Sequence, residues 1–324
     1  MTQQIDTTSR TQAEIRRLAI GRGNALNLNR ILVPLNGFRR SEQILPFASM
    51  MADWFAGEIT LFHSLPPTHP ARGARPGQVH YPDAPHDRGT SLAAAYLEEV
   101  VSRLGPHGVK SRWGIATGNA APMIASRSAT SSFGIVAIAT TARSRAHRLF
   151  SPGLLDNLWQ TTSVPLLIVN PHHATLNGAP PQAPDTIIVP CTRGSADAAL
   201  PIASAIAGAS RSNVKIVLAR ETSSGEIEDE LINTFAADGF EVEIEQGSKD
   251  IVKQVLGIQA ENTGSWIVAG SKMRSGLRRT VLGSTADMIA RDAVGPILVV
   301  PDSDTRRRRE RSAHEATRNL AASL

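Results

Sequence analysis

The chain has 324 residues, of which 41% are hydrophobic and 19% charged, and its formal net charge is +5. This length is enough for two domains of ordinary size, each with its own core. No apolar run approaches the roughly 20 residues that a membrane-spanning helix needs, so we expect no membrane insertion. The N-terminal residues lack the apolar core of a secretory signal, and the one cysteine, Cys191, excludes an internal disulfide. The expected location is the cytoplasm.

Residues 1–28 are polar and are expected to form a flexible arm. The first predicted domain covers residues 29–171. Its strands are expected to alternate with helices, and the insertion Pro66–Thr90, with its six prolines, is expected to be a surface loop. The segments that carry this pattern are ILVPLNGFRRSEQILPFA from Ile31, EITLFHSL from Glu58, GNAAPMIASRSA from Gly118, GIVAIAT from Gly134 and VPLLIVN from Val164.

A Pro-, Gly- and Ala-rich linker at residues 172–185 leads to a second predicted domain at 186–301, which repeats the first. The fragment IIVPCTRGSADAALPIA from Ile187 matches the fragment from Ile31, and Pro190 falls on Pro34. The later segments recur as NVKIVLARE from Asn213, GSKDIVKQVLGIQAE from Gly247, SWIVAGS from Ser265 and GPILVVP from Gly295.

Short apolar, β-branched runs that alternate with helical segments are typical of parallel strands covered on both faces. We therefore predict an α/β fold with two tandem doubly wound domains, each containing a five-stranded parallel sheet. Residues 302–324 are predicted to be a basic C-terminal tail, with RRRRER at Arg306–Arg311. Glu310 and Glu315 dilute its charge and only 4% of the chain is aromatic, so no nucleic-acid partner is expected.

The loop after the fourth strand of the second repeat is the main candidate for a ligand site. In AGSKMRSGLRRTVLGSTADM, from Ala269, Gly270 and Gly283 would let backbone approach a phosphate, and Ser284 and Thr285 begin a helix that offers free N–H groups and hydroxyls. Four basic side chains favour an anion. Alternatively, Ser284 and Asp287 form an ordinary capping box next to a solvated basic face.

The two repeats resemble universal stress protein domains over nearly all of residues 30–301. That family typically has a Gly, two residues, Gly, nine residues, Gly-Ser/Thr loop, which binds ATP in its nucleotide-binding members. The matching positions here are Gly270, Met273, Gly283 and Ser284, and Thr192 stands where the family has an aspartate after the first strand. The resemblance implies an adenine-nucleotide alpha hydrolase-like fold, ATP with Mg²⁺ as ligand, and Pro190, Cys191 and Thr192 at the base and ribose end.

The same loop of the first repeat has Ala139, Ala142 and Pro152 at the three glycine positions and Asn36 at the aspartate position. Because Pro152 lacks a backbone donor, we interpret this copy as a structural partner domain. Domains that resemble this family usually pair through their last strands, which predicts a homodimer or an internal pseudo-dimer.

The sequence therefore predicts a stress-response regulatory protein that binds ATP or a related nucleotide in its second domain and acts through protein partners. The alternative is a scaffold that binds no nucleotide. No catalytic residue is expected, because the second repeat has no histidine to activate Ser284, although slow ATP hydrolysis stays open. The histidines near the proline-rich insertion are expected to bind no metal; they are His63, His69, His80 and His86.

Overall fold

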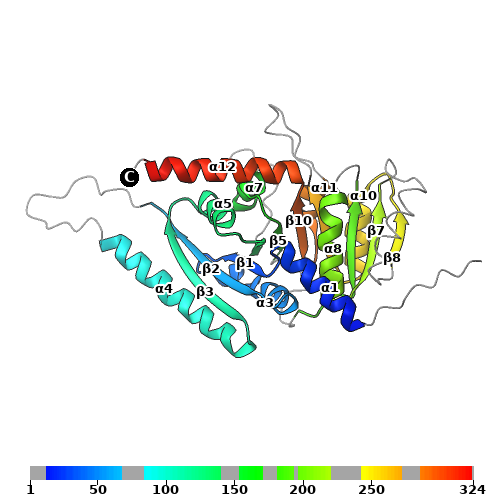
Figure 1. Cartoon of the computed structure of the whole chain (residues 1–324), viewed down its shortest axis with the longest axis horizontal. Helices are drawn as coiled ribbons and strands as arrows, with labels where there is room; N and C mark the ends of the chain where they lie inside the picture. Colours follow the sequence, from blue (N-terminus) through cyan, green and yellow to red (C-terminus); the bar gives the residue numbers. More distant parts are fainter. Residues whose placement is uncertain are drawn as a thin grey trace, which may run out of the picture. The chain divides into compact units, whose positions relative to one another are not determined.

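A computed structural model describes residues 12–67, 84–139, 153–170, 181–192, 196–219, 242–271 and 285–322. The chain divides into two compact units (Figure 1). Domain 1 combines Asn27–Pro181 with Ser303–Leu324, and domain 2 combines Gln182–Asp302 with Met1–Leu26. Each domain thus contains one repeat together with the terminal segment that adjoins the other repeat.

The sheet of domain 1 has the strand order β3-β2-β1-β4-β5, and its neighbouring strands run parallel. Its strands are β1 (Arg30–Pro34), β2 (Glu58–Leu65), β3 (Lys110–Thr117), β4 (Ile135–Ala139) and β5 (Leu166–Val169). The helices described in this repeat are α2 (Arg39–Glu42), α3 (Leu45–Trp54), α4 (Ala84–Leu104), α5 (Ala120–Thr130) and α7 (Leu154–Thr161), with a 3₁₀ turn at Gly105–His107.

Domain 2 repeats this topology with the strand order β10-β9-β6-β7-β8, again parallel. Its strands are β6 (Thr186–Cys191), β7 (Asn213–Leu218), β8 (Val242–Gln246), β9 (Trp266–Ser271) and β10 (Ile297–Pro301). The helices described in this repeat are α8 (Ala196–Ser210), α10 (Ile251–Glu261) and α11 (Thr285–Asp292). The predicted fold class, two doubly wound α/β domains, is confirmed.

The strand register is duplicated as well as the strand order. Ile31 of β1 pairs with Ile135 of β4, and the equivalent Ile187 of β6 pairs with Trp266 of β9. The central residues of β1 and β6 are fully buried in succession, which requires cover on both faces of the sheet. This explains why the strands appear in the sequence as continuous apolar runs rather than as alternating patterns.

Residues 12–25, which the sequence places in a flexible arm, form helix α1 (Gln12–Ala25), which packs along α8 of domain 2 (Figure 1). Residues 202–209 of α8 are all buried, and a helix that is apolar all round needs cover on every side. Strands β6 and β9 contact α8, α1 adds further cover, and Arg22 of α1 donates a hydrogen bond to the buried Ser204 hydroxyl. The N-terminal helix therefore packs on domain 2 and covers part of α8.

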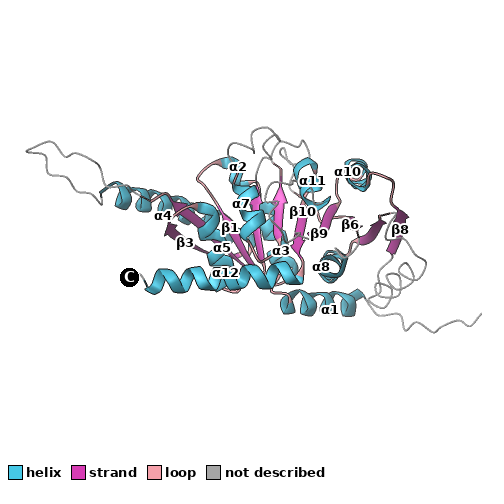
Figure 2. Ribbon diagram, turned by 90° about the horizontal axis from the view of Figure 1, so that it is seen from above, coloured by secondary structure: helices cyan, strands magenta, loops and turns pink. Residues whose placement is uncertain are grey.

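The predicted basic tail likewise forms a helix, α12 (Ser303–Ala322), which packs against α5 of domain 1 (Figure 2). Arg309 donates from its two terminal nitrogens to the carbonyl oxygens of Trp159 and Thr162, at 2.5 Å each, and Thr305 is 2% exposed. Carbonyls at the C-terminal end of α7 lack helical partners, and a guanidinium there satisfies them and complements the helix dipole.

The predicted loop Pro66–Thr90 is wrong at its C-terminal end, because α4 already begins at Ala84. Pro85 lies in the first helical turn, where a missing N–H costs nothing, so proline there starts a helix instead of preventing one. Residues 68–83 of this insertion lie outside the described part of the chain. Over the residues that are described, the helices lack the apolar length that a bilayer crossing needs.

Candidate functional site

The candidate site lies at the topological switch point of domain 2. Strand β6 is flanked by β7 on one side and by β9 on the other. The chain therefore builds the sheet outward from β6 in one direction through β7 and β8, and then in the other direction through β9 and β10. In an open parallel sheet, the crevice beyond the carboxyl ends of such a strand pair is where ligands bind. Thr192 directly follows β6, and Gly270 is the second-to-last residue of β9.

Five of the seven predicted site residues fall within the described part of the chain. The carboxyl ends of β6 and β9 bring Pro190, Cys191, Thr192 and Gly270 to one edge of the sheet, and Thr285 is the first residue of α11. Gly283, Ser284 and Met273 lie outside the described residues. The predicted ligand site therefore includes the carboxyl ends of β6 and β9 and the first residue of α11.

These residues differ in what they offer a ligand. Pro190 is buried and Cys191 is 1% exposed, whereas Thr192, Gly270 and Thr285 are partly exposed. The Cys191 carbonyl accepts a hydrogen bond from the Ala219 amide at 2.9 Å. Pro190 and Cys191 are thus packed in the interior, and Thr192 and Gly270 are the partly exposed residues at the two strand ends.

Helix α11 carries a buried ion pair close to the same edge. Arg291 donates to Asp287 at 2.6 Å, and each side chain is only 10% exposed. The carboxylate in the first turn of α11 is therefore compensated from within the helix. This matters for an anionic ligand, since an uncompensated carboxylate would repel it from the helix N-terminus.

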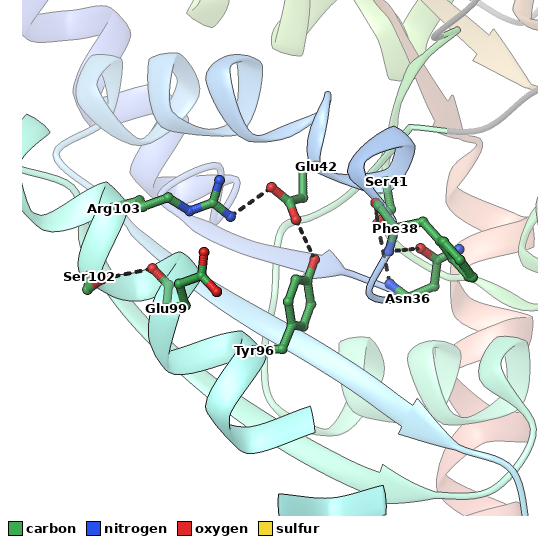
Figure 3. A network of polar contacts seen from close by, with 8 residues as sticks. All are labelled: Asn36, Phe38, Ser41, Glu42, Tyr96, Glu99, Ser102 and Arg103. Atoms are coloured by element: carbon green, nitrogen blue, oxygen red, sulfur yellow. Dashed lines mark hydrogen bonds and ion pairs between the residues drawn. The ribbon is translucent and has the colours of Figure 1, made fainter. Parts of the chain in front are cut away.

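At the equivalent edge of domain 1, the chain after β1 forms a hydrogen-bonded turn (Figure 3). The Asn36 side chain accepts from the Phe38 amide at 3.1 Å, and the Ser41 hydroxyl donates to the Phe38 carbonyl at 2.7 Å. Gly37, between them, has φ +81°, which a residue with a side chain rarely adopts. The polar side chain at the family's aspartate position is thus used to build the turn.

Glu42, at the end of this turn, fixes it to helix α4 (Figure 3). Its carboxylate accepts from the Tyr96 hydroxyl at 3.0 Å and from Arg103 at 2.7 Å. Burial, followed by the charge of Glu42, raises the pKa of Tyr96, which therefore remains a neutral donor. The hydrogen bond to Glu42 raises the pKa of Arg103. Nothing in the sequence spacing connects these side chains, so sequence reasoning missed this cluster.

Positions in the two sheets can be matched through their shared register. Ala139 and Gly270 each lie four residues beyond the residue that pairs with Ile31 or Ile187. The sequence assigned Ala139 to the position of the first glycine, and the strand register agrees with that assignment. Domain 1 therefore has a Cβ where domain 2 has none.

Two of the four histidines near the insertion, His63 and His86, lie in the described part of the chain. His63 lies in β2, as expected, and its Nδ1 is 2.8 Å from the Leu35 carbonyl oxygen, while His86 lies in α4. His69 and His80 are outside the described residues. Among the residues that are described, no group of three or more histidine, cysteine or acidic side chains is placed to hold a metal ion.

A duplicated, doubly wound parallel sheet with helices on its faces defines a tandem α/β protein. The model of the universal stress protein family matches residues 27–170 and 187–301, and the chain belongs to that family. A search of curated proteins found no match.

Solved structures share this tandem fold. A universal stress protein from Archaeoglobus fulgidus DSM 4304 is similar with a TM-score of 0.67 and 20% identity, over 86% of this chain and 98% of that one. A protein of unknown function from Pseudomonas aeruginosa PAO1 is similar with a TM-score of 0.62 and 18% identity, over 90% of this chain and 99% of its own. At these identities the likeness extends to the fold alone.

Proposed function

We propose that domain 2 binds ATP or a related adenine nucleotide at the carboxyl ends of β6 and β9, and that this binding makes the protein a regulator in stress adaptation. The observation that carries the proposal is the pairing of β6 with β9 at the switch point, with Gly270 at the end of β9. Backbone without a Cβ leaves room for a phosphate, and parallel strand ends direct ligands to this edge.

Each described site residue has a role in this proposal. Thr192 offers one hydroxyl to the ribose or base, in place of a carboxylate. Gly270 and the start of α11 at Thr285 offer backbone and hydroxyl contacts to the phosphates, next to the Asp287–Arg291 pair that leaves no uncompensated negative charge. Mg²⁺ would accompany the phosphates and neutralise part of their charge. Gly283 and Ser284 complete the set.

Domain 1 is proposed to be a structural partner. Its first-strand end is tied into the Asn36 turn and held by Glu42 to α4, and Ala139 fills the position of Gly270. This arrangement leaves the edge of domain 1 without the elements assigned to the nucleotide in domain 2. The protein is proposed to have no catalytic residue of its own.

The test is a calorimetric titration of ATP, with and without Mg²⁺, into the wild type and two variants. Gly283→Asp puts a carboxylate against the proposed phosphates, and saturable binding should be lost. Ala139→Asp introduces the same charge at the position in domain 1 that matches Gly270, and binding should persist. Circular dichroism confirms folding in both. Equal loss in both variants would refute the assignment to domain 2.

The competing function is a scaffold that binds no nucleotide, favoured by the burial of Pro190 and Cys191 at the predicted base end. It predicts no heat from ATP in the wild type over the micromolar to millimolar range, with the fold intact. In that case the surfaces of the two domains, not the switch point, would hold the protein's partners.

A further inference from the structure

Helix α12 presents a row of arginines on its outer side. Arg306, Arg307, Arg308 and Arg311 are exposed, whereas Arg309 is half-buried because it binds the end of α7. Residues three and four apart lie on one face of a helix, so Arg307 and Arg311 share the face opposite Thr305 and Arg309, with the exposed Arg308 at the side of that face. Asp304 and Glu315 lie on the same outer face. The basic run is therefore divided between one arginine that docks the helix and several that face solvent.

The acidic side chains of α12 oppose this charge only in part. Glu310 is half-buried, and Glu315 is exposed one turn after Arg311. Asp304 pairs with Arg307 at 2.5 Å, but both side chains are well exposed, and such pairs contribute little in water. Arg308 and Arg311 have no acidic partner among the described ion pairs. The four exposed arginines outnumber the two exposed carboxylates, Asp304 and Glu315, so the exposed side of α12 keeps a net positive charge.

We propose that this outer face of α12 is a binding surface for the phosphate backbone of a nucleic acid. Clustered arginines on a rigid helix attract phosphates without reading sequence, since their charge releases counterions from the polyanion. Docking by Arg309 and Thr305 fixes the arginines in advance, which reduces the ordering cost that a free tail would carry. From the sequence alone we expected no nucleic-acid partner, because we interpreted the arginine run as a tail whose positive charge Glu310 and Glu315 reduce.

An acidic lipid surface suits this face less well. A helix that binds in a membrane interface needs large apolar side chains on the side it inserts. The side chains described in α12, residues 303–315, include no large exposed hydrophobic group, and the inward side of the helix is occupied by domain 1. Phosphate recognition here is expected to rest on charge and hydrogen bonds alone.

The experiment measures fluorescence anisotropy of a labelled DNA duplex of about 20 base pairs with the full-length protein, over a series of salt concentrations. The wild type should bind with log K falling linearly against log salt at a slope of about −3, as expected for roughly three neutralised phosphates. The variant Arg307→Gln/Arg308→Gln/Arg311→Gln should bind about tenfold or more weakly at low salt, with a slope nearer zero.

The matched control is Arg39→Gln/Arg40→Gln/Lys110→Gln, which removes the same charge from exposed positions of α2 and β3 in the same domain. It should stay within about threefold of the wild type, since only the long-range charge changes. Thermal unfolding of each variant confirms that α12 remains docked.

Three results would overturn the proposal. The wild type fails to bind the duplex at low salt; the two triple variants weaken binding equally, so that only net charge matters; or the protein binds vesicles with anionic lipid while the duplex does not compete. Weakening confined to the α12 variant supports it.

Discussion

Replacing Arg309 by alanine should release helix α12 from domain 1. The guanidinium donates two hydrogen bonds, at 2.5 Å each, to the carbonyls of Trp159 and Thr162 at the end of α7. A hydrogen bond involving a charged group contributes about 1.5–3 kcal/mol when well desolvated. Arg309 is half-buried and both carbonyls regain water in the variant, so we expect a combined loss of about 2 kcal/mol.

For a domain of this size, that loss corresponds to a fall in Tm of about 4–8 °C. The assay is differential scanning calorimetry, together with limited proteolysis that detects cleavage within Ser303–Ala322. Arg306→Ala is the control, because Arg306 is exposed on the same helix and its removal should change Tm by no more than about 1–2 °C. Equal Tm values for the two variants, or equal protease resistance, would refute the view that Arg309 holds the helix.

Three further predictions concern single positions. Thr192→Asp restores the carboxylate of the family pattern and should tighten ATP binding by about tenfold in a calorimetric titration; unchanged affinity would remove Thr192 from the site. Gly134→Ala should destabilise domain 1 by about 2–3 kcal/mol in denaturant titrations, because a Cβ there would lie 2.0 Å from the Asn27 carbonyl oxygen. Gly89→Ala should stabilise it by about 0.5–1 kcal/mol, because Gly89 lies within α4 and its Cβ would make an ordinary contact with the Leu65 side chain at 3.7 Å. Hydrogen bonds, first from Gln254 and then from Lys215, lower the pKa of Glu245, so the ionised carboxylate stabilises domain 2 at neutral pH and this stabilisation is lost below about pH 4. In the Glu245→Gln variant, Tm should therefore fall less between neutral pH and acid. A pH profile of Tm equal to that of the wild type would contradict this.

The duplicated core could be predicted from the sequence because its evidence is local. The fragments from Ile31 and Ile187 are continuous apolar runs of β-branched residues, and such runs become strands buried on both faces. Once the repeat is recognised, the order and register of the strands follow, and the register of Ala139 against Gly270 agrees with the alignment of the two loops. Buried strands of this kind can be predicted without knowledge of distant contacts.

The terminal helices could not be predicted in the same way, because their stability comes from tertiary contacts. RRRRER has no apolar stripe that marks a docked helix, and the groups that hold it are the carbonyls of Trp159 and Thr162. One signal was present for the N-terminal helix: residues 202–209 of α8 form about two turns that are almost entirely apolar, and a sheet alone cannot cover them. That surplus of apolar surface predicts an additional helix but does not say which one.

The candidate site was predictable in part. Its place at the ends of β6 and β9 follows from the alternation of strands and helices, but the burial of Pro190 and Cys191 depends on how α8 and the neighbouring strands pack. The Glu42 cluster with Tyr96 and Arg103 joins residues more than 50 positions apart and has no local sequence signature. The roles of Gly283 and Ser284, which lie outside the described residues, stay predictions.

The most direct test of the nucleotide site is amide hydrogen exchange, followed by mass spectrometry, with and without saturating ATP and Mg²⁺. We predict slower exchange in segments that contain Thr192 and Gly270, and unchanged exchange in the matching segments of domain 1 around Asn36 and Ala139. Protection confined to domain 1, or no protection in either domain when calorimetry reports binding, would contradict the assignment of the site to the carboxyl ends of β6 and β9.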